Sequence, residues 1–287
     1  MRSFRDQPHF LDSVLVYDAL MPALFVNNFI MNKVVPEAWR FQMLVFTLHL
    51  YDTRDPARPT SGLTSSNLKR LCAAQGIASP GRVTAFLGVM RLGGHLARLR
   101  SAADNRVVQL QPTATFVAVV EAWNDAIFTI LDTVDPGGDF TGQRAAHDRL
   151  GWDMRRGGAE TLLAGWRPLE PFPEVSHFVS RDGGWVLLTH IVASSLRAHG
   201  GTKLEPVAVD LPALGKQFGI SRSQLRALLE SAHGAGLLDA PPRNGSRVVP
   251  SSILVCAYLA WLASYLENYR RCTLAALSTL RSGLASG

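Results

Sequence analysis

The sequence predicts a mainly α-helical protein with small β-hairpins, in which one order of elements occurs twice. The stretches 64–112 and 210–250 each contain a capped helix, a glycine turn, a second capped helix and a basic hairpin. Hydrophobic residues make up 47% of the 287-residue chain and charged residues 18%, as in a folded globular protein. A chain of this length is expected to form about two domains.

Capping residues and glycines define the two helices of the first stretch. The N-cap residue types at 65–67 stand just before an apolar-periodic run, and Gly76 ends that helix. Ser79 and Pro80 begin the next helix, which Gly93-Gly94 ends. The sequence therefore predicts two short helices joined by a tight turn.

A basic hairpin follows these helices. Residues 95–100 and 106–111 alternate well enough to pair as strands around 101–105. Helix, turn, helix and hairpin is the layout of a winged helix-turn-helix, whose second helix enters the DNA major groove.

Positive charge is concentrated in this stretch. Seven basic residues stand against Asp104 alone, a local net charge of 7 − 1 = +6, which equals the net charge of the whole chain. Such a cluster is expected of a phosphate-binding surface. A solvated face of a small helical domain is the alternative interpretation.

The pattern returns in the second half of the chain, which predicts an internal duplication. Asp210 and Ser221 are expected to cap the two helices, and Asn244-Gly245 is a strong hairpin-turn signal. The corresponding pairs are Trp39 with Trp185, Gly76 with Gly219, Arg106 with Arg247, and Trp123 with Trp261. We therefore expect tandem winged helix-turn-helix domains related by a pseudo-two-fold axis.

Three sections are predicted along the chain. Residues 1–134 hold N-terminal helices and the first winged-helix domain, beginning with an apolar segment at 10–29 that should be covered by another helix or subunit. Residues 135–183 are rich in glycine, proline and charge, and form a linker with short helices. Residues 184–287 hold the second winged-helix domain and a C-terminal helix.

Other function classes have weak signals. The S-x-x-K match at 66–69 is explained by a helix cap, and the scattered histidines lack ligand spacing, so we expect no enzyme activity, no metal and no cofactor. The apolar runs near 14–30 and 251–266 are too short or interrupted to span a membrane. The three cysteines are expected to be buried free thiols, consistent with the cytoplasm.

Two stretches resemble known DNA-binding proteins. Residues 217–229, QFGISRSQLRALL, resemble a bacterial helix-turn-helix of the Gly-Ile-Ser type, and 64–112 resembles the winged helix of the multiple antibiotic resistance regulator (MarR) family. The Asp-x-Arg pair at that family's wing tip is matched by Asp104 and Arg106, whereas the second unit has Gly245-Ser246-Arg247. The likeness covers about 36–134, and more loosely 184–270.

The resemblance implies a bacterial transcription regulator that binds double-stranded DNA through paired winged helices and often responds to a small aromatic effector. Members of the family usually carry one such domain and dimerise, whereas this chain has two. The two units of one chain are therefore expected to act as a built-in pseudo-dimer, and a homodimer is expected if the second unit is a scaffold instead. The alternatives are a winged-helix interaction or scaffold module and a plasmid-type replication initiator.

The candidate DNA contacts come from both units. Arginine can pair bidentately with guanine, threonine can touch a thymine methyl, and wing arginines can meet phosphate or the minor groove. The candidates are Lys69, Arg70, Arg82, Thr84, Arg91, Arg98, Arg100 and Arg106 in the first unit, and Arg222, Ser223, Gln224, Arg226, Arg243 and Arg247 in the second. The net charge of 5 − 3 = +2 over 210–250 predicts weaker phosphate binding by the second unit.

The first recognition helix carries small residues, and they allow two interpretations. Ala85 and Gly88 would let the helix lie deep in a groove, or they would permit close packing inside the protein.

Overall fold

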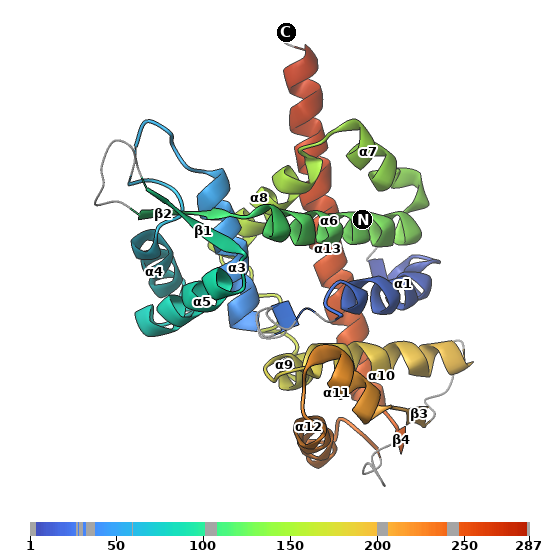
Figure 1. Cartoon of the computed structure of the whole chain (residues 1–287). Coiled ribbons are helices and arrows are strands. Elements are labelled where there is room, and N and C mark those ends of the chain that lie inside the picture. The colour runs from blue at the N-terminus through green and yellow to red at the C-terminus, as the bar shows by residue number, and fades with distance from the viewer. Residues whose placement is uncertain are drawn as a thin grey trace. The chain divides into compact units, whose positions relative to one another are not determined.

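The chain is mainly helical, with two small antiparallel two-stranded sheets, as predicted (Figure 1). Figure 1 draws a computed structural model, which describes residues 4–26, 28, 31–32, 38–58, 60–100, 108–199, 206–239 and 247–285. The chain forms two compact units, which we describe separately. The 38–124 unit contains residues 38–124, 148–166 and 272–287, and the 167–271 unit contains 1–37, 125–147 and 167–271.

The 38–124 unit contains the first helix-turn-helix and its hairpin. Its elements are α3 (Ala38–Asp52), α4 (Ser65–Ala74), α5 (Pro80–Leu92), β1 (Leu96–Arg100), β2 (Val108–Pro112), α8 (Leu150–Leu163), the first part of α6 (Ala114–Val134) and the last part of α13 (Ser252–Ala285).

Strands β1 and β2 form the predicted antiparallel ribbon, with Leu96 opposite Pro112. A segment that the sequence did not predict runs along the other edge of β2. Thr64 bridges to Gln109, and the Leu110 N–H donates to the Leu63 carbonyl at 2.8 Å. The ribbon is thereby tied to the segment that leads into α4.

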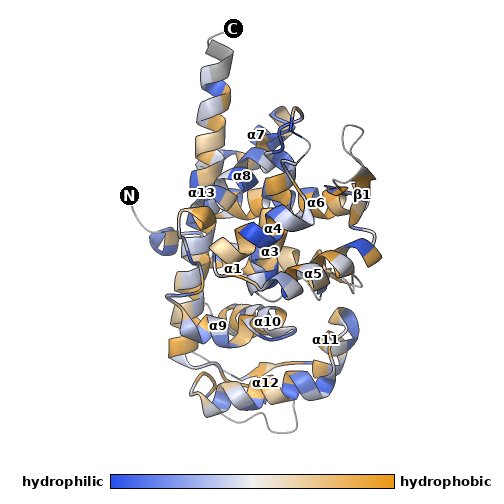
Figure 2. Cartoon of the chain, turned by 90° about the vertical axis from the view of Figure 1, so that its left-hand side faces the viewer, coloured by the Kyte–Doolittle hydropathy of each residue, from blue (hydrophilic) through white to orange (hydrophobic). Residues whose placement is uncertain are grey.

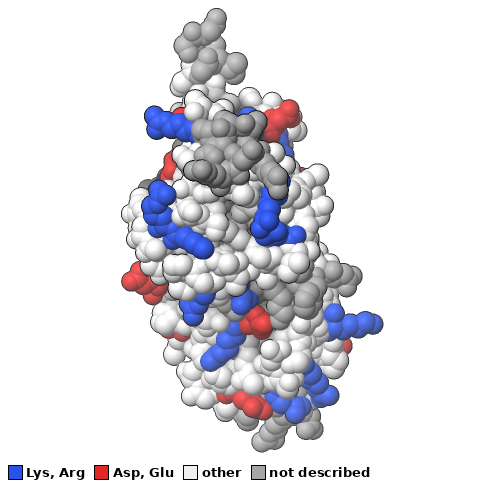
Figure 3. Space-filling view, turned by 60° about the vertical axis from the view of Figure 1, so that its left-hand side comes forward, with Lys and Arg blue, Asp and Glu red and all other residues white. Residues whose placement is uncertain are grey.

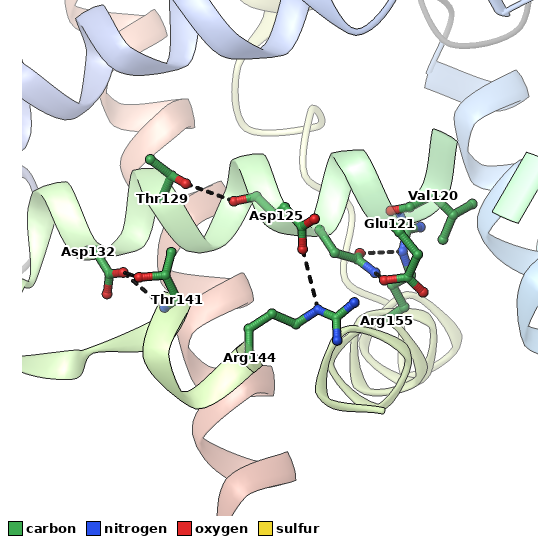
Figure 4. Close-up of polar contacts among 9 residues, drawn as sticks. Val120, Glu121, Asp125, Thr129, Asp132, Thr141, Arg144 and Arg155 are labelled. Atoms are coloured by element: carbon green, nitrogen blue, oxygen red, sulfur yellow. Dashed lines mark hydrogen bonds and ion pairs between the residues drawn. The ribbon is translucent and has the colours of Figure 1, made fainter. Parts of the chain in front are cut away.

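A polar contact holds α8 to the first part of α6 (Figure 4). The Arg155 guanidinium donates to Asn124 Oδ1 at 2.6 Å and to the Val120 carbonyl at 3.3 Å. Asn124 is fully buried, and a Cβ atom at Gly151 would lie only 2.5 Å from its side-chain nitrogen. A glycine at 151 therefore lets the two helices approach closely.

The 167–271 unit contains the second helix-turn-helix. Its elements are η1 (Phe4–Asp6), α1 (Phe10–Ala23), η2 (Pro136–Gly138), α7 (Phe140–Ala146), α9 (Pro173–Val179), α10 (Gly184–His199), β3 (Val207–Ala208), α11 (Leu211–Phe218), α12 (Arg222–Gly234), β4 (Arg247–Val248), the second part of α6 and most of α13 (Ser252–Ala285).

The pairing expected across the predicted hairpin of this unit is present but short, since the Asp239 N–H donates to the Val249 carbonyl at 2.8 Å. Strand β4 pairs with β3, which precedes α11 and was not predicted. Leu238 also forms an antiparallel bridge with Pro250. The turn signal Asn244-Gly245 lies outside the described residues.

The core of the 167–271 unit is aromatic. The Trp185 indole N–H donates to the Tyr17 hydroxyl at 3.2 Å, and the Tyr17 ring meets both Trp185 and Trp261 edge-on. Helix α1 packs against α10, so its apolar side is covered by its own chain.

The rest of this unit includes helices in the predicted linker. Asp132 on α6 accepts hydrogen bonds from Thr141, through its backbone N–H at 2.9 Å and through its hydroxyl (Figure 4). This contact fixes the start of α7.

Among the described helices, α6 alone is long and apolar enough to cross a membrane by length and composition, and half of its apolar window is buried within the protein.

The two helix-turn-helix segments share their turn geometry. Gly76 and Gly219 both adopt left-handed φ angles, of 66° and 68°. The isoleucine after each glycine donates its N–H to the carbonyl five residues earlier, from Ile77 to Cys72 and from Ile220 to Gly215, both at 2.9 Å. A residue with a Cβ atom would be strained at either glycine.

Candidate nucleic-acid interface

The N-cap of helix α4 lies one residue before the predicted caps. Thr64 Oγ1 accepts a hydrogen bond from the Asn67 N–H at 3.1 Å, so Thr64 is the N-cap. The Asn67 side chain instead donates to the carbonyls of Thr60 and Gly62 and accepts from Arg70 at 3.0 Å. Asn67 therefore ties the preceding loop to α4 and holds Arg70 against the helix surface.

Helix α5 has one buried side and one open side. Ser79 caps it as predicted, since its side chain accepts from the Arg82 N–H. The buried side consists of Val83, Phe86, Leu87 and Met90, and the open side carries Arg82, Thr84, Ala85 and Arg91. The Thr84 hydroxyl donates to the Pro80 carbonyl at 2.9 Å, which leaves its oxygen able to accept.

The small residues of α5 face open space. Ala85 is exposed, and a Cβ atom at Gly88 would meet no atom of the described residues within 4 Å. Ala85 and Gly88 therefore do not serve close packing inside this unit. Their outer surface leaves room for another molecule to approach the α5 backbone.

Helix α12 also exposes its predicted contact residues. Arg222, Ser223, Gln224 and Arg226 are all exposed, and Figure 2 shows hydrophilic and hydrophobic residues alternating along this helix. Ser221 and Gln224 form a capping box, in which Gln224 Oε1 accepts from the Ser221 N–H at 3.1 Å and Ser221 Oγ accepts from the Gln224 N–H at 3.2 Å.

The capping box limits what Gln224 can read. A bidentate contact with adenine needs both the amide oxygen and the amide nitrogen of glutamine. The Gln224 oxygen is engaged within the helix, so its NH₂ group alone remains to donate. The S-x-x-Q spacing in the sequence is the signal for this cap.

The basic candidates on these elements lack carboxylate partners. No ion pair with a described carboxylate is formed by Lys69, Arg70, Arg82, Arg91, Arg98, Arg222, Arg226 or Arg247. Arginines elsewhere behave differently: Arg149 pairs with Asp52 at 3.0 Å, and Arg270 with Asp135 at 2.8 Å. The face drawn in Figure 3 likewise shows more Lys and Arg than Asp and Glu.

Three predicted contact residues lie wholly or partly outside the described part of the chain. Arg106 and Arg243 are not among the described residues, and Arg100 is described only as a residue of β1.

Trp39, which the repeat pairs with Trp185, is a neighbour of the candidate surface that was not among the predicted contacts. It is half-buried at the start of α3, and the guanidinium carbons of Arg40 and Arg82 lie over its ring at 5.0 Å and 5.3 Å from the centroid. Its counterpart Trp185 lies in the core instead. No local pattern in the sequence indicates the contact with Arg82.

A buried histidine stands where α5 passes into the ribbon. His95 is 3% exposed, packs edge-on against Phe116, and donates its backbone N–H to the Met90 carbonyl at 2.8 Å. Burial lowers the pKa of His95, which favours the neutral form of the ring. Thr113 N–H donates to the His95 carbonyl at 3.0 Å, which fixes the end of β2 against the start of β1.

Two hollows of the 167–271 unit bear on the expected effector. The smaller one, beside Trp185 and Phe218, has a volume of about 10 Å³, which is room for one water rather than an aromatic molecule. The other is open and lies along α9 beside Glu170 and His177. Within the described chain, no group of three His, Cys, Asp or Glu side chains is placed to hold a metal ion.

Comparisons with protein-family models, with curated proteins and with solved structures give no match.

Proposed function

We propose that this protein is a DNA-binding transcription regulator that contacts duplex DNA through two winged helix-turn-helix units. The observation that carries the proposal is the set of basic side chains on α4, α5, β1, α12 and β4 that have no described carboxylate partner. Positive charge without an internal partner is suited to an external anion, and a duplex offers a regular array of phosphates.

The order of elements supports the same proposal. In each unit a helix is followed by a short extended segment, the helix-turn-helix and a returning strand that pairs with that segment. This order is the one expected of a winged helix, whose second helix enters the major groove. Helices α5 and α12 are the recognition helices of the proposal.

The test is the salt dependence of duplex binding by the full chain. Affinity for a labelled duplex should fall by orders of magnitude between about 50 and 200 mM salt. Removing two phosphate contacts, by Arg91→Ala together with Arg98→Ala, should lower the slope of log affinity against log salt by about 2.

Arg281→Ala is the matched control. Arg281 is an exposed arginine on α13 in the same unit, outside the helix-turn-helix and ribbon, so its removal should leave the slope unchanged. If the wild type binds no genomic fragment even at low salt, the proposed function is wrong.

A protein-docking role is the second candidate, because apolar side chains stand exposed on the same elements. Leu92 on α5 is 91% exposed, and Leu99 and Val108 on the ribbon are 46% and 41% exposed. Apolar surface of this kind is more useful to a protein partner than to phosphates. Absence of duplex binding would favour this candidate.

A replication initiator would use the same DNA contacts, and the identity of the bound fragments distinguishes it from a regulator.

A further inference from the structure

Arg82 is held at the surface by an aromatic ring from another helix. Its guanidinium carbon lies over the Trp39 ring, 5.3 Å from the centroid, and Arg82 forms no ion pair with any described carboxylate. Trp39 belongs to α3, whereas Arg82 is the third residue of α5. The contact therefore joins the start of the recognition helix to the scaffold of the unit.

This contact leaves the hydrogen-bonding capacity of Arg82 available. A ring attracts a guanidinium through its face, whereas the N–H donors of arginine point outward in the guanidinium plane. A bidentate contact with the O6 and N7 atoms of guanine uses two of these donors. Arg82 can therefore remain over Trp39 while it reads a base.

The place of Arg82 suits this role. Residues near the N-terminus of a recognition helix contact base edges. The corresponding residue of α12, also three positions after the capping serine, is Gln224, whose side chain is fixed by Ser221. Both helices thus hold the side chain at this position, one through an aromatic ring and one through a hydrogen bond.

We propose that Trp39 is a positioning residue for sequence discrimination, which holds the Arg82 guanidinium ready for a guanine in the major groove. The inference rests on the proposed function. Trp39 itself touches no base in this scheme and acts through Arg82 alone. Its benefit is to reduce the freedom that the arginine would otherwise lose on binding DNA.

The test compares binding of two duplexes by the full chain. Selection from a random duplex library with the wild type gives a preferred duplex, and Arg82→Ala identifies the base pair at which discrimination is lost. That loss should be about 5- to 150-fold, as for a bidentate contact. Trp39→Leu should lower discrimination at the same base pair by about two- to fivefold, the range of an exposed cation–π contact.

Three further variants separate positioning from a structural role. Trp39→Phe keeps an aromatic face and should retain most of the discrimination. In the Arg82→Ala background, Trp39→Leu should cause no further loss, since it acts through Arg82. Arg91→Ala, at the other end of α5, should weaken binding to both duplexes alike. Thermal unfolding of each variant shows whether it is folded.

Three outcomes overturn the inference, and the last can be told apart from the first two. If a folded Trp39→Leu variant weakens the preferred and changed duplexes equally, or if its effect adds fully to that of Arg82→Ala, Trp39 does not position Arg82. If the wild type binds no duplex with salt dependence, the proposed function fails and takes this inference with it.

Discussion

At the scale of single residues, the exposure of a side chain does not reveal which of its atoms are free. Gln224 is exposed on α12, as expected from the sequence, but its oxygen closes a capping box with Ser221. Arg82 was expected to face a groove, and it is exposed, but its guanidinium also lies over Trp39. The exposure of both side chains follows from helical periodicity, whereas the contact with Trp39 depends on how two distant helices pack.

We predict that Gln224 contributes more to the stability of α12 than to base preference. Gln224→Ala removes the hydrogen bond to the Ser221 N–H and should lower the free energy of unfolding by about 0.5–1.5 kcal/mol, as measured in urea. The base preference obtained by duplex selection should not change. Gln224→Glu is the control, because it keeps the acceptor oxygen and should keep the stability. A variant of normal stability with an altered base preference would show instead that the amide reads a base.

At the scale of elements, local signals predicted where the helices on either side of the two glycine turns begin and end. Ser79 and Ser221 cap α5 and α12, and Gly76 and Gly219 make the turns. The short extended segments beside β2 and β4 were not predicted, because each is only about two residues long and its partner lies far along the chain. The helical content of the predicted linker, residues 135–183, was also underestimated, and α8 is one of the helices concerned.

The packing of α8 on α6 gives a prediction with a built-in control. Gly151→Ala places a methyl group against Asn124 and disturbs its hydrogen bond with Arg155, so it should lower the free energy of unfolding by about 1–3 kcal/mol. Gly158→Ala lies on the same helix, where a Cβ atom meets nothing within 4 Å, and should raise stability by about 0.5–1 kcal/mol. Urea denaturation of both variants measures the difference. Equal effects would mean that Gly151 is not needed for this close approach.

At the scale of the whole molecule, the pseudo-two-fold arrangement remains a prediction. The sequence repeat and the shared turn geometry concern each unit separately. If both units read one duplex, their recognition helices must meet major grooves about one helical turn, or 10–10.5 base pairs, apart.

Footprinting with the full chain tests this arrangement. Arg91→Ala with Arg98→Ala should weaken protection over one half of the bound site, and Arg222→Ala with Arg226→Ala should weaken it over the other half. One chain per duplex is the expected stoichiometry by light scattering. Two chains per duplex, with a footprint indifferent to Arg222 and Arg226, would show that the 38–124 unit binds alone and pairs through a homodimer.

The third residue of α5 is Arg82 and that of α12 is Gln224, and this difference bears on the symmetry of the DNA site in the proposed function. A dimer of identical subunits presents the same reader twice and so favours inverted repeats in DNA. Under the proposed function, a single chain that presents α5 with Arg82 and α12 with Gln224 is under no such constraint. Its preferred site can be non-palindromic, and the bound protein then points in one direction along the genome, with a defined upstream and downstream side.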